Sequence, residues 1–355
     1  MQLMAKKDKG LHPYVSYLKD RYYNYGHFQE EEGLPSLKGF HVEDVTMLAL
    51  SPWERKGGRG AFINLSEQEV DDAYVCEIAP GASLKPQRHM YEEVIYVLKG
   101  RGSTSVWNPG QEPLSFEWKE GSLFAIPLNA HHQHFNGDGT QKALLLGVTS
   151  APLMMNLTHS RDFIFNCPFV FSDRFAGAPD EFRKEATWKK DVPGGLWETN
   201  FIADVRDVGL ISWEEEGRGF KHTYIALTAN VMKVHIAEFE VGTYKKAHRH
   251  GPGAHILILR GTGYSLMWEP GTEPRRFNWG VGGLISPPAG WYHQHFNTGS
   301  GPVFYLALHR PASLNSKSDR GQIEYEDEDP KIRGMYEADL AKNGVQIRMP
   351  PRTTK

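Results

Sequence analysis

The strongest constraint in this sequence of 355 residues is an internal repeat. When the chain is displaced by 161 residues, the distance from His89 to His250, many glycines, tryptophans and prolines coincide without a gap. The clearest match sets His-Gln-His-Phe-Asn at residues 132–136 against the same five letters at residues 293–297. Two copies of one unit therefore account for most of the chain, and each copy predicts a folded domain of its own.

The repeat also predicts where the domains begin and end. We expect one domain at residues 47–152 and a second at residues 208–312, joined by a connector at residues 153–207. Residues 1–46 form an N-terminal arm and residues 313–355 a C-terminal tail. The segment 329–340 of the tail carries an early Pro330 and helix-forming residues, which predicts a short helix.

Within each copy, short runs rich in Val, Ile, Tyr, Phe and Leu are interrupted by Gly, Pro or Asn every 8–12 residues. Such regular, short apolar runs are typical of strands, and helical periodicity is almost absent from the copies. An all-β fold follows, with each copy a sandwich or double-sheet jelly roll whose interior can hold a ligand.

Charge and cysteine content exclude several classes of partner. Forty basic against forty-three acidic side chains leave a net charge of −3, so we expect neither a nucleic acid nor an anionic membrane as partner. No apolar run approaches the ~20 residues of a membrane helix. The two cysteines, Cys76 and Cys167, do not have the spacing of a disulfide scaffold, and residues 1–10 lack the apolar region of a signal peptide. We expect a cytoplasmic protein.

Histidines in the second copy predict a metal site. His248 and His250 are two residues apart, so on an extended strand both side chains point to the same face. His293, on another strand, is the natural third ligand. Three neutral imidazoles suit Fe, Zn, Cu or Ni and leave coordination positions open. His295 and His255 lie close enough in sequence to serve either as proton carriers or as packing residues.

The matching positions of the first copy are Gln87, His89 and His132, with Glu93 four residues beyond His89. His89, Glu93 and His132 make a set of two histidines and one carboxylate, which can hold Fe(II) or Mn(II). Gln87 is a poor ligand. The alternative is a decayed site that is kept for the stability of the barrel.

Both copies resemble cupin domains. The residues that carry the resemblance in the first copy are Gly81, His89, Glu93, Gly100, Gly121, Pro127, His132 and Asn136, with Gln87 in place of a histidine and Asn129 in place of a glycine. In the second copy they are Gly242, His248, His250, Gly261, Gly282, Pro288, Gly290, His293 and Asn297, with Ala254 in place of the glutamate. The resemblance implies a bicupin: two tandem double-stranded β-helix (jelly-roll) barrels with short flanking helices.

A three-histidine set without the glutamate is similar to that of the bicupin ring-cleaving dioxygenases of the gentisate and 1-hydroxy-2-naphthoate type. That resemblance implies Fe(II) on His248, His250 and His293. Two features depart from it. Those enzymes usually carry the metal in the N-terminal barrel, and the arginine that they use to hold a substrate carboxylate falls on Ile256 here.

Three functional hypotheses follow. The first is an Fe(II) dioxygenase that cleaves a small aromatic (gentisate-like) or enolisable substrate with O₂, with His295 or His255 moving a proton. Four aromatic residues are candidates for the wall of its substrate site, with packing in the barrel core as the alternative for each: Trp268, Phe277, Trp291 and Tyr292. The second hypothesis is a non-redox Mn, Ni or Zn enzyme, namely a lyase, isomerase or decarboxylase, and the third is a bicupin that binds a small molecule without turnover. The family resemblance also implies a homodimer or higher homo-oligomer.

Overall fold

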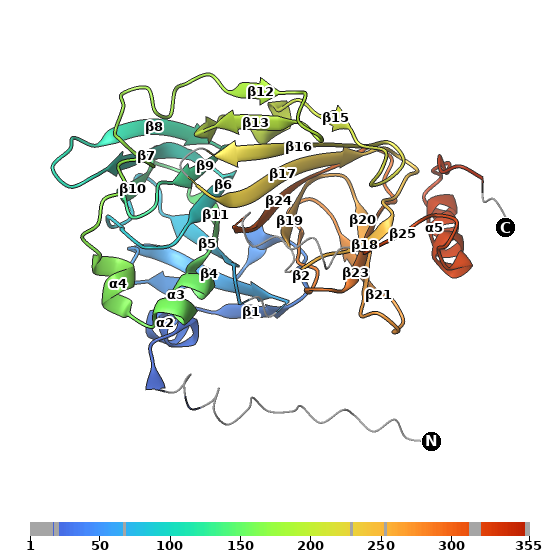
Figure 1. Cartoon of the computed structure of the whole chain (residues 1–355), viewed down its shortest axis with the longest axis horizontal. Coiled ribbons are helices and arrows are strands. Elements are labelled where there is room, and N and C mark those ends of the chain that lie inside the picture. Colours follow the sequence, from blue (N-terminus) through green and yellow to red (C-terminus); the bar gives the residue numbers. More distant parts are fainter. Residues whose placement is uncertain are drawn as a thin grey trace.

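The computed structural model describes residues 17, 21–66, 69–227, 230–251, 254–311 and 321–351. The first sixteen residues of the N-terminal arm and residues 313–320 of the tail lie outside the described residues. Two β-barrels lie side by side, each built from one large and one small sheet (Figure 1). The predicted all-β fold of two tandem jelly-roll barrels is confirmed.

The first barrel pairs a large sheet with a small antiparallel one. In spatial order the large sheet consists of β1 (Ser36–Gly39), β4 (Gly58–Leu65), β5 (Asp72–Ile78), β11 (Ala143–Thr149), β6 (Glu93–Lys99), β9 (Leu123–Ile126) and β14 (Phe201–Ile202), with β3 (Ser51–Trp53) beside β4. The small sheet consists of β10 (His131–Asn136), β7 (Arg101–Trp107) and β8 (Leu114–Lys119).

The second barrel repeats this plan. Its large sheet consists of β12 (Thr187–Lys189), β13 (Leu196–Thr199), β16 (Phe220–Leu227), β17 (Met232–Phe239), β24 (Val303–Pro311), β19 (Ala254–Arg260), β22 (Leu284–Ile285) and β2 (His41–Val42), with β15 (Ile211–Ser212) beside β16. Its small sheet consists of β21 (Arg275–Trp279), β20 (Gly263–Trp268), β23 (Tyr292–Asn297), β18 (Ala247–Arg249) and β25 (Gly321–Ile323).

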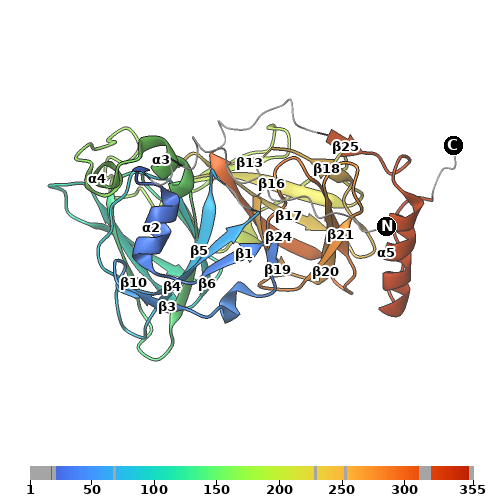
Figure 2. The ribbon, with the colours of Figure 1, turned by 90° about the horizontal axis from the view of Figure 1, so that it is seen from below.

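Short helices flank the barrels at opposite ends (Figure 2). Helices α2 (Tyr25–Glu32), α3 (Ala151–Thr158) and α4 (Arg161–Asn166) cover the first barrel. Helix α5 (Pro330–Lys342) packs Ile332, Tyr336 and Leu340 against the small sheet of the second barrel. Among the described residues, no helix is long and apolar enough to cross a membrane.

The two large sheets pack against each other through their outer faces. On β4, Phe62 belongs to the core inside the first barrel, whereas its neighbour Ile63 belongs to the core between the barrels. Tyr74 and Val75 divide in the same way on β5. Successive side chains of a strand point to opposite faces, so a sheet covered on both sides needs continuous apolar runs. This explains why runs such as residues 143–148 do not alternate with polar residues.

Each barrel is completed by a strand from outside its expected boundaries. β2, in the N-terminal arm, pairs with β22 of the second barrel, and β14, in the connector, pairs with β9 of the first. β1 and β13 occupy matching positions in the two large sheets, where β1 runs parallel to β4 and β13 runs parallel to β16. The structural repeat therefore begins near residues 36 and 196, earlier than the sequence motifs place it.

Candidate metal centres

The second barrel brings His248, His250 and His293 together. His248 on β18 lies directly opposite His293 on β23, and His250 follows immediately after β18. The ring of His293 is 4.2 Å from that of His248 and 4.8 Å from that of His250 between centroids. One nitrogen from each ring lies within 4.8 Å of the others, which is close enough for all three to bind one ion.

Backbone carbonyls fix the orientation of these rings. Nδ1 of His248 lies 3.0 Å from the carbonyl of Lys246, Nδ1 of His250 lies 3.1 Å from that of Gly251, and Nδ1 of His293 lies 3.3 Å from that of Trp291. A carbonyl can only accept, so each Nδ1 carries the proton and each Nε2 presents a lone pair. Metal-binding histidines are usually held in this way by their second nitrogen. The residues therefore fit a metal ion.

Burial keeps two of the rings neutral. Burial first, and then the neighbouring His248, lowers the pKa of His250 to about 3. Burial and the same neighbour hold the pKa of His293 well below its usual value. The neutral imidazole is the form that binds a metal.

A cavity of about 60 Å³ opens beside this cluster and is lined by His248 and His250. Lys245 also lines the cavity, and its Nζ lies 3.0 Å from a carboxylate oxygen of Glu216 and 3.4 Å from the hydroxyl of Tyr305. Burial alone would lower the pKa of Lys245, but Tyr305 and Glu216 outweigh it and raise the pKa. The cavity is lined by two ammonium groups, Lys233 and Lys245, and one carboxylate, Glu216, so a net positive charge lies beside the histidine cluster.

Three further histidines line this cavity and were not predicted: His222 on β16, His235 on β17 and His309 on β24. Nε2 of His309 lies 3.0 Å from Nδ1 of His235, so the two rings share one hydrogen bond. In the sequence, Phe220, His222 and Tyr224 alternate along one strand and so share a face. That alternation is the signal that could have revealed His222.

His295, predicted as a proton carrier, is held by a hydrogen-bond chain. Its Nδ1 lies 2.7 Å from the hydroxyl of Ser265, which accepts a hydrogen bond of 2.9 Å from Nε1 of Trp279. The first barrel repeats the chain: His134 and Trp118 both bond to the hydroxyl of Thr104. The same three positions recur in both barrels. We therefore interpret His295 as a residue whose hydrogen bond connects two strands of the small sheet.

His255 lies elsewhere. Its ring is fully buried, and Nδ1 is 3.3 Å from a carboxylate oxygen of Asp71, a residue of the first barrel. The sequence left His255 as either a proton carrier or a packing residue, and on β19 its side chain points toward the other barrel. We therefore assign it no role at the cluster.

The predicted aromatic wall does not line the cavity. Trp268 stacks on Tyr292 with centroids 5.5 Å apart, and both Phe277 and Trp291 pack on Phe40 of the N-terminal arm. The aromatic residues that do line the cavity come from the large sheet and its neighbouring loop: Trp213, Phe220 and Tyr224. Trp268 and Tyr292 belong to the core between the small sheet and helix α5, whereas Phe277 and Trp291 pack against the core inside the second barrel without lining the cavity.

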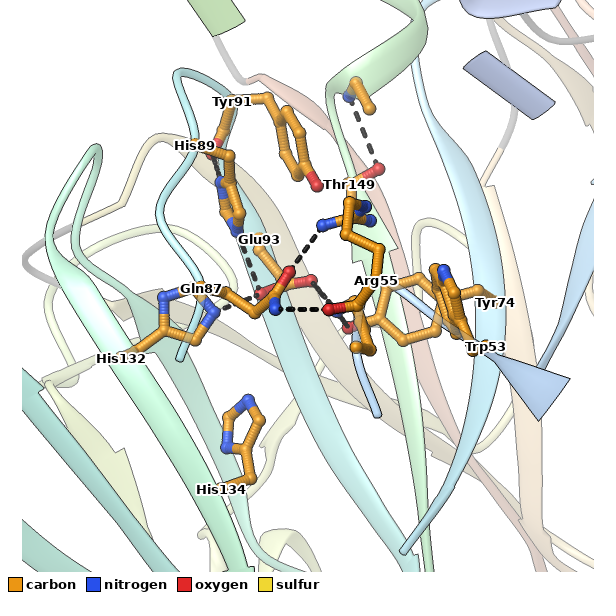
Figure 3. A network of polar contacts seen from close by, with 12 residues as sticks. Trp53, Arg55, Tyr74, Gln87, His89, Tyr91, Glu93, His132, His134 and Thr149 are labelled. Carbon is orange, nitrogen blue, oxygen red and sulfur yellow. Dashed lines mark hydrogen bonds and ion pairs between the residues drawn. The ribbon is translucent and has the colours of Figure 1, made fainter. Parts of the chain in front are cut away.

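The first barrel holds the second candidate set, His89, Glu93 and His132, all fully buried (Figure 3). Nε2 of His89 lies 3.3 Å and Nε2 of His132 lies 3.7 Å from the same oxygen of Glu93. Nδ1 of each ring again faces a backbone carbonyl, that of Tyr91 for His89 and that of Ala130 for His132. This set also fits a metal ion.

Lys56 distinguishes the first cluster from the second. The other oxygen of Glu93 accepts a hydrogen bond of 2.6 Å from Tyr74 and lies 3.5 Å from the buried ammonium of Lys56. Burial would raise the pKa of Glu93, but Lys56 and His89 outweigh it and hold the pKa well below its usual value. The cavity next to Lys56 and Tyr74 is only about 10 Å³, roughly the space of one water molecule.

Gln87 is not available as a ligand. Its amide nitrogen lies within 3.2 Å of the carbonyls of Arg55, Lys85 and Pro86, and its amide oxygen accepts a hydrogen bond from Arg55 (Figure 3). The side chain is thus committed to the backbone on one side and to a guanidinium on the other. The predicted set of four in the first barrel reduces to three.

Comparisons with known proteins agree with this architecture. Residues 74–148 match the model of the cupin domain. The solved oxalate decarboxylase of Lactobacillus farciminis in its formate complex is 16% identical, with a TM-score of 0.53 over 80% of this chain and 88% of that chain. A Bacillus subtilis oxalate decarboxylase structure, used to study Mn(II) centres, is 15% identical, with a TM-score of 0.53 over 90% and 89%.

The chain has the two-barrel fold of these solved structures, and the cupin match lies in its first barrel. At these identities the solved structures establish the fold alone, and they do not bear out the finer resemblance to ring-cleaving dioxygenases. A curated relative, auxin-binding protein 4 of Zea mays, is 29% identical over 124 residues, which is 31% of this chain. The chain spans 58% of the length of that relative.

Proposed function

We propose that this two-barrel protein is a metal-dependent enzyme that converts a small carboxylate anion by non-redox chemistry in its C-terminal barrel. The observation that carries this proposal is that His248 and His250 line the same cavity as Lys245. Lys233 lines it too, so two ammonium groups and one carboxylate, Glu216, share this space with the metal site, and the net positive charge suits an anionic substrate.

His248, His250 and His293 would hold the metal ion. Imidazole ligands suit Zn, Fe and Ni by softness, and Mn is supported by the Mn(II) centres of the Bacillus subtilis oxalate decarboxylase, which shares the fold. When bound, the ion would act as a Lewis acid on the carboxylate oxygens. The solved neighbours are oxalate decarboxylases, and decarboxylation is accordingly the reaction that we favour.

The size of the cavity favours a small substrate. Ligand sites for drug-sized molecules measure about 300–1,000 Å³, and a cavity of about 150 Å³ is known to hold benzene. The cavity in the second barrel measures about 60 Å³. A two- or three-carbon acid fits this scale better than an aromatic ring does.

The residues around the cavity supply the remaining roles. Lys245 would pair with a substrate carboxylate, and Glu216 together with the Tyr305 hydroxyl holds its ammonium in position. The hydrogen-bonded pair of His235 and His309 offers neutral imidazole nitrogens for proton transfer. The low volume of the cavity excludes bulk water from these groups.

The Fe(II) dioxygenase remains the second candidate, because three histidines without a carboxylate first indicated it. It would use the same ligands with O₂, but its gentisate-like substrate would need a larger cavity. Non-catalytic binding is the third candidate. The predicted self-association is not tested by a single chain and stays a prediction.

Two measurements separate these candidates. Metal content is compared among the wild type, His250→Ala and the matched first-barrel variant His89→Ala. We expect the His250→Ala variant to contain about one metal ion per chain fewer than the wild type. Oxalate is then supplied while CO₂, formate and net O₂ uptake are followed. Turnover without net O₂ uptake supports the proposal, stoichiometric O₂ uptake supports the dioxygenase, and metal unaffected by His250→Ala contradicts the site.

A further inference from the structure

We propose that a basic groove on the first barrel binds a small dianionic ligand that carries a ring, such as a phosphomonoester. The basic groove is lined by Arg55, Lys85, Arg88 and Arg161, with His131 and Phe165 as its ring-bearing members. It lies between the loop that contains Gln87 and helix α4, and its volume is about 510 Å³.

Within the described part of the chain, two of the cations in the basic groove have only backbone partners. Nζ of Lys85 donates to the carbonyl of Glu54 at 2.6 Å. Nε of Arg88 donates to the carbonyl of Asn129 at 3.1 Å, and one Nη donates to that of Phe169 at 3.3 Å. Carbonyls orient these side chains but do not neutralise them, so both charges remain available to a ligand.

The other two cations are each paired with one carboxylate. Nε of Arg55 lies 2.7 Å from Glu32, and Nε of Arg161 lies 3.1 Å from Glu31. Four cations against these two carboxylates leave two positive charges in a chain whose net charge is −3. A dianion would complement this local excess, and arginine side chains bind phosphate and carboxylate groups in a bidentate manner.

Rings line the same groove. Phe165 packs against two guanidinium groups, and its ring centroid lies 5.0 Å from Cζ of Arg55 and 5.6 Å from Cζ of Arg161. The ring of His131 is stacked on Trp107 at 5.5 Å, with an angle of 13° between the planes. Burial, and then Arg88, lowers the pKa of His131, which leaves this ring uncharged at neutral pH.

The volume of the basic groove favours an organic ligand over an inorganic ion. At about 510 Å³ it falls within the range of sites for small organic molecules, about 300–1,000 Å³. A phosphomonoester is close to a dianion at pH 7, because its second pKa is about 6. Its phosphate would match the arginines and its organic part would match Phe165 and His131.

This inference does not depend on the proposed function, because the basic groove shares no lining residue with the cavity of the second barrel. The test is calorimetric titration of the full chain, after treatment with EDTA, with three probes. Phenyl phosphate is the phosphomonoester, phthalate is a dicarboxylate of similar shape, and phenol lacks the charge. We expect phenyl phosphate to bind with a Kd at or below about 1 mM, and phenol not to bind.

Variants locate the binding. Arg161→Gln changes an exposed side chain, so it leaves the fold intact, and it is expected to weaken binding about tenfold, as is Arg88→Gln. Arg101→Gln, an exposed arginine outside the groove, is the matched control and should leave the Kd unchanged. Equal binding of phthalate would assign the site to dianions in general. No binding of either dianion, or equal binding by Arg161→Gln and the wild type, would overturn the proposal.

Discussion

His248 and His293 face each other across two antiparallel strands, with their ring centroids 4.2 Å apart. Two strands that already pair through the backbone hold these imidazoles in place before any ion arrives. We expect His293→Ala to weaken the affinity for Zn(II) or Mn(II) by more than the roughly 10–100-fold typical of losing an outer-shell contact. Calorimetry on the apoprotein measures this, with His27→Ala on helix α2 as control. An unchanged affinity would be incompatible with the assigned ligands.

Lys245→Met should reduce kcat/KM for the carboxylate substrate by about 10–100-fold, because a hydrogen bond to a charged group contributes about 1.5–3 kcal/mol. Metal content should stay the same, since Lys245 is not a ligand. Lys245→Arg keeps the charge and should recover part of the activity. If Lys245→Met and Lys245→Arg reduce kcat/KM equally, the reaction does not depend on the positive charge of Lys245.

Stability should decrease as the pH falls below the ordinary histidine pKa of about 6.5. Burial, and then Lys245, lowers the pKa of His222 to about 4, and burial, and then His309, holds that of His235 well below the usual value. The unfolded chain therefore binds protons that the folded chain does not. His222 alone should reduce the free energy of unfolding by up to about 1.4 kcal/mol per pH unit between roughly pH 6 and 4, and His235 adds to the loss in the same direction.

Urea unfolding of the metal-free protein at several pH values measures this slope. In His222→Gln, the number of protons taken up on unfolding should fall by about one. The same proton uptake in the variant and the wild type would show that His222 is not held neutral.

Ser265→Ala should destabilise the second barrel by about 1–3 kcal/mol, because Trp279 and His295 both lose a buried partner. Thr104→Ala is the matched change in the first barrel, and urea unfolding measures both. Metal binding should persist in each. A change in the pH profile of activity in Ser265→Ala, at unchanged stability, would instead assign His295 to the chemistry.

His255→Leu should cost about 3–5 kcal/mol, since it leaves the buried carboxylate of Asp71 without its partner at the barrel interface. The double variant with Asp71→Asn should recover part of that loss, and metal content should not change in either. Thermal or urea unfolding tests the prediction. A single variant as stable as the wild type would show that the pair is not an ion pair.

The sequence predicted the fold and the three-histidine set because both depend on local patterns. A repeat with regular short strands defines two barrels, and histidines two residues apart on a strand must share a face. Asn129 shows that a motif glycine can be replaced by another residue that adopts the same backbone conformation. It stands where the motif has glycine, adopts a left-handed φ of 59°, and its amide donates to the carbonyls of Cys167 and Phe169.

Features that depend on closure of the barrel could not be predicted in this way. Lys245 and His309 reach one cavity from segments more than sixty residues apart, and nothing local marks either of them as a cavity residue. The predicted aromatic wall does not line the cavity for the same reason, because the sequence does not say which aromatic side chains meet at the cavity once the barrel closes. Strands of two residues, such as β2 and β14, carry no pattern at all.

Those two short strands have a consequence for how the molecule can be divided. Because β2 closes an edge of the second barrel and β14 closes an edge of the first, each half of the sequence carries a piece that belongs to the other. A protease cut in the connector before β14 would divide the polypeptide into two chains, and we expect the two chains to stay associated. Each fragment would contribute one strand to the other fragment's barrel. Either fragment produced alone would expose an unpaired sheet edge to solvent.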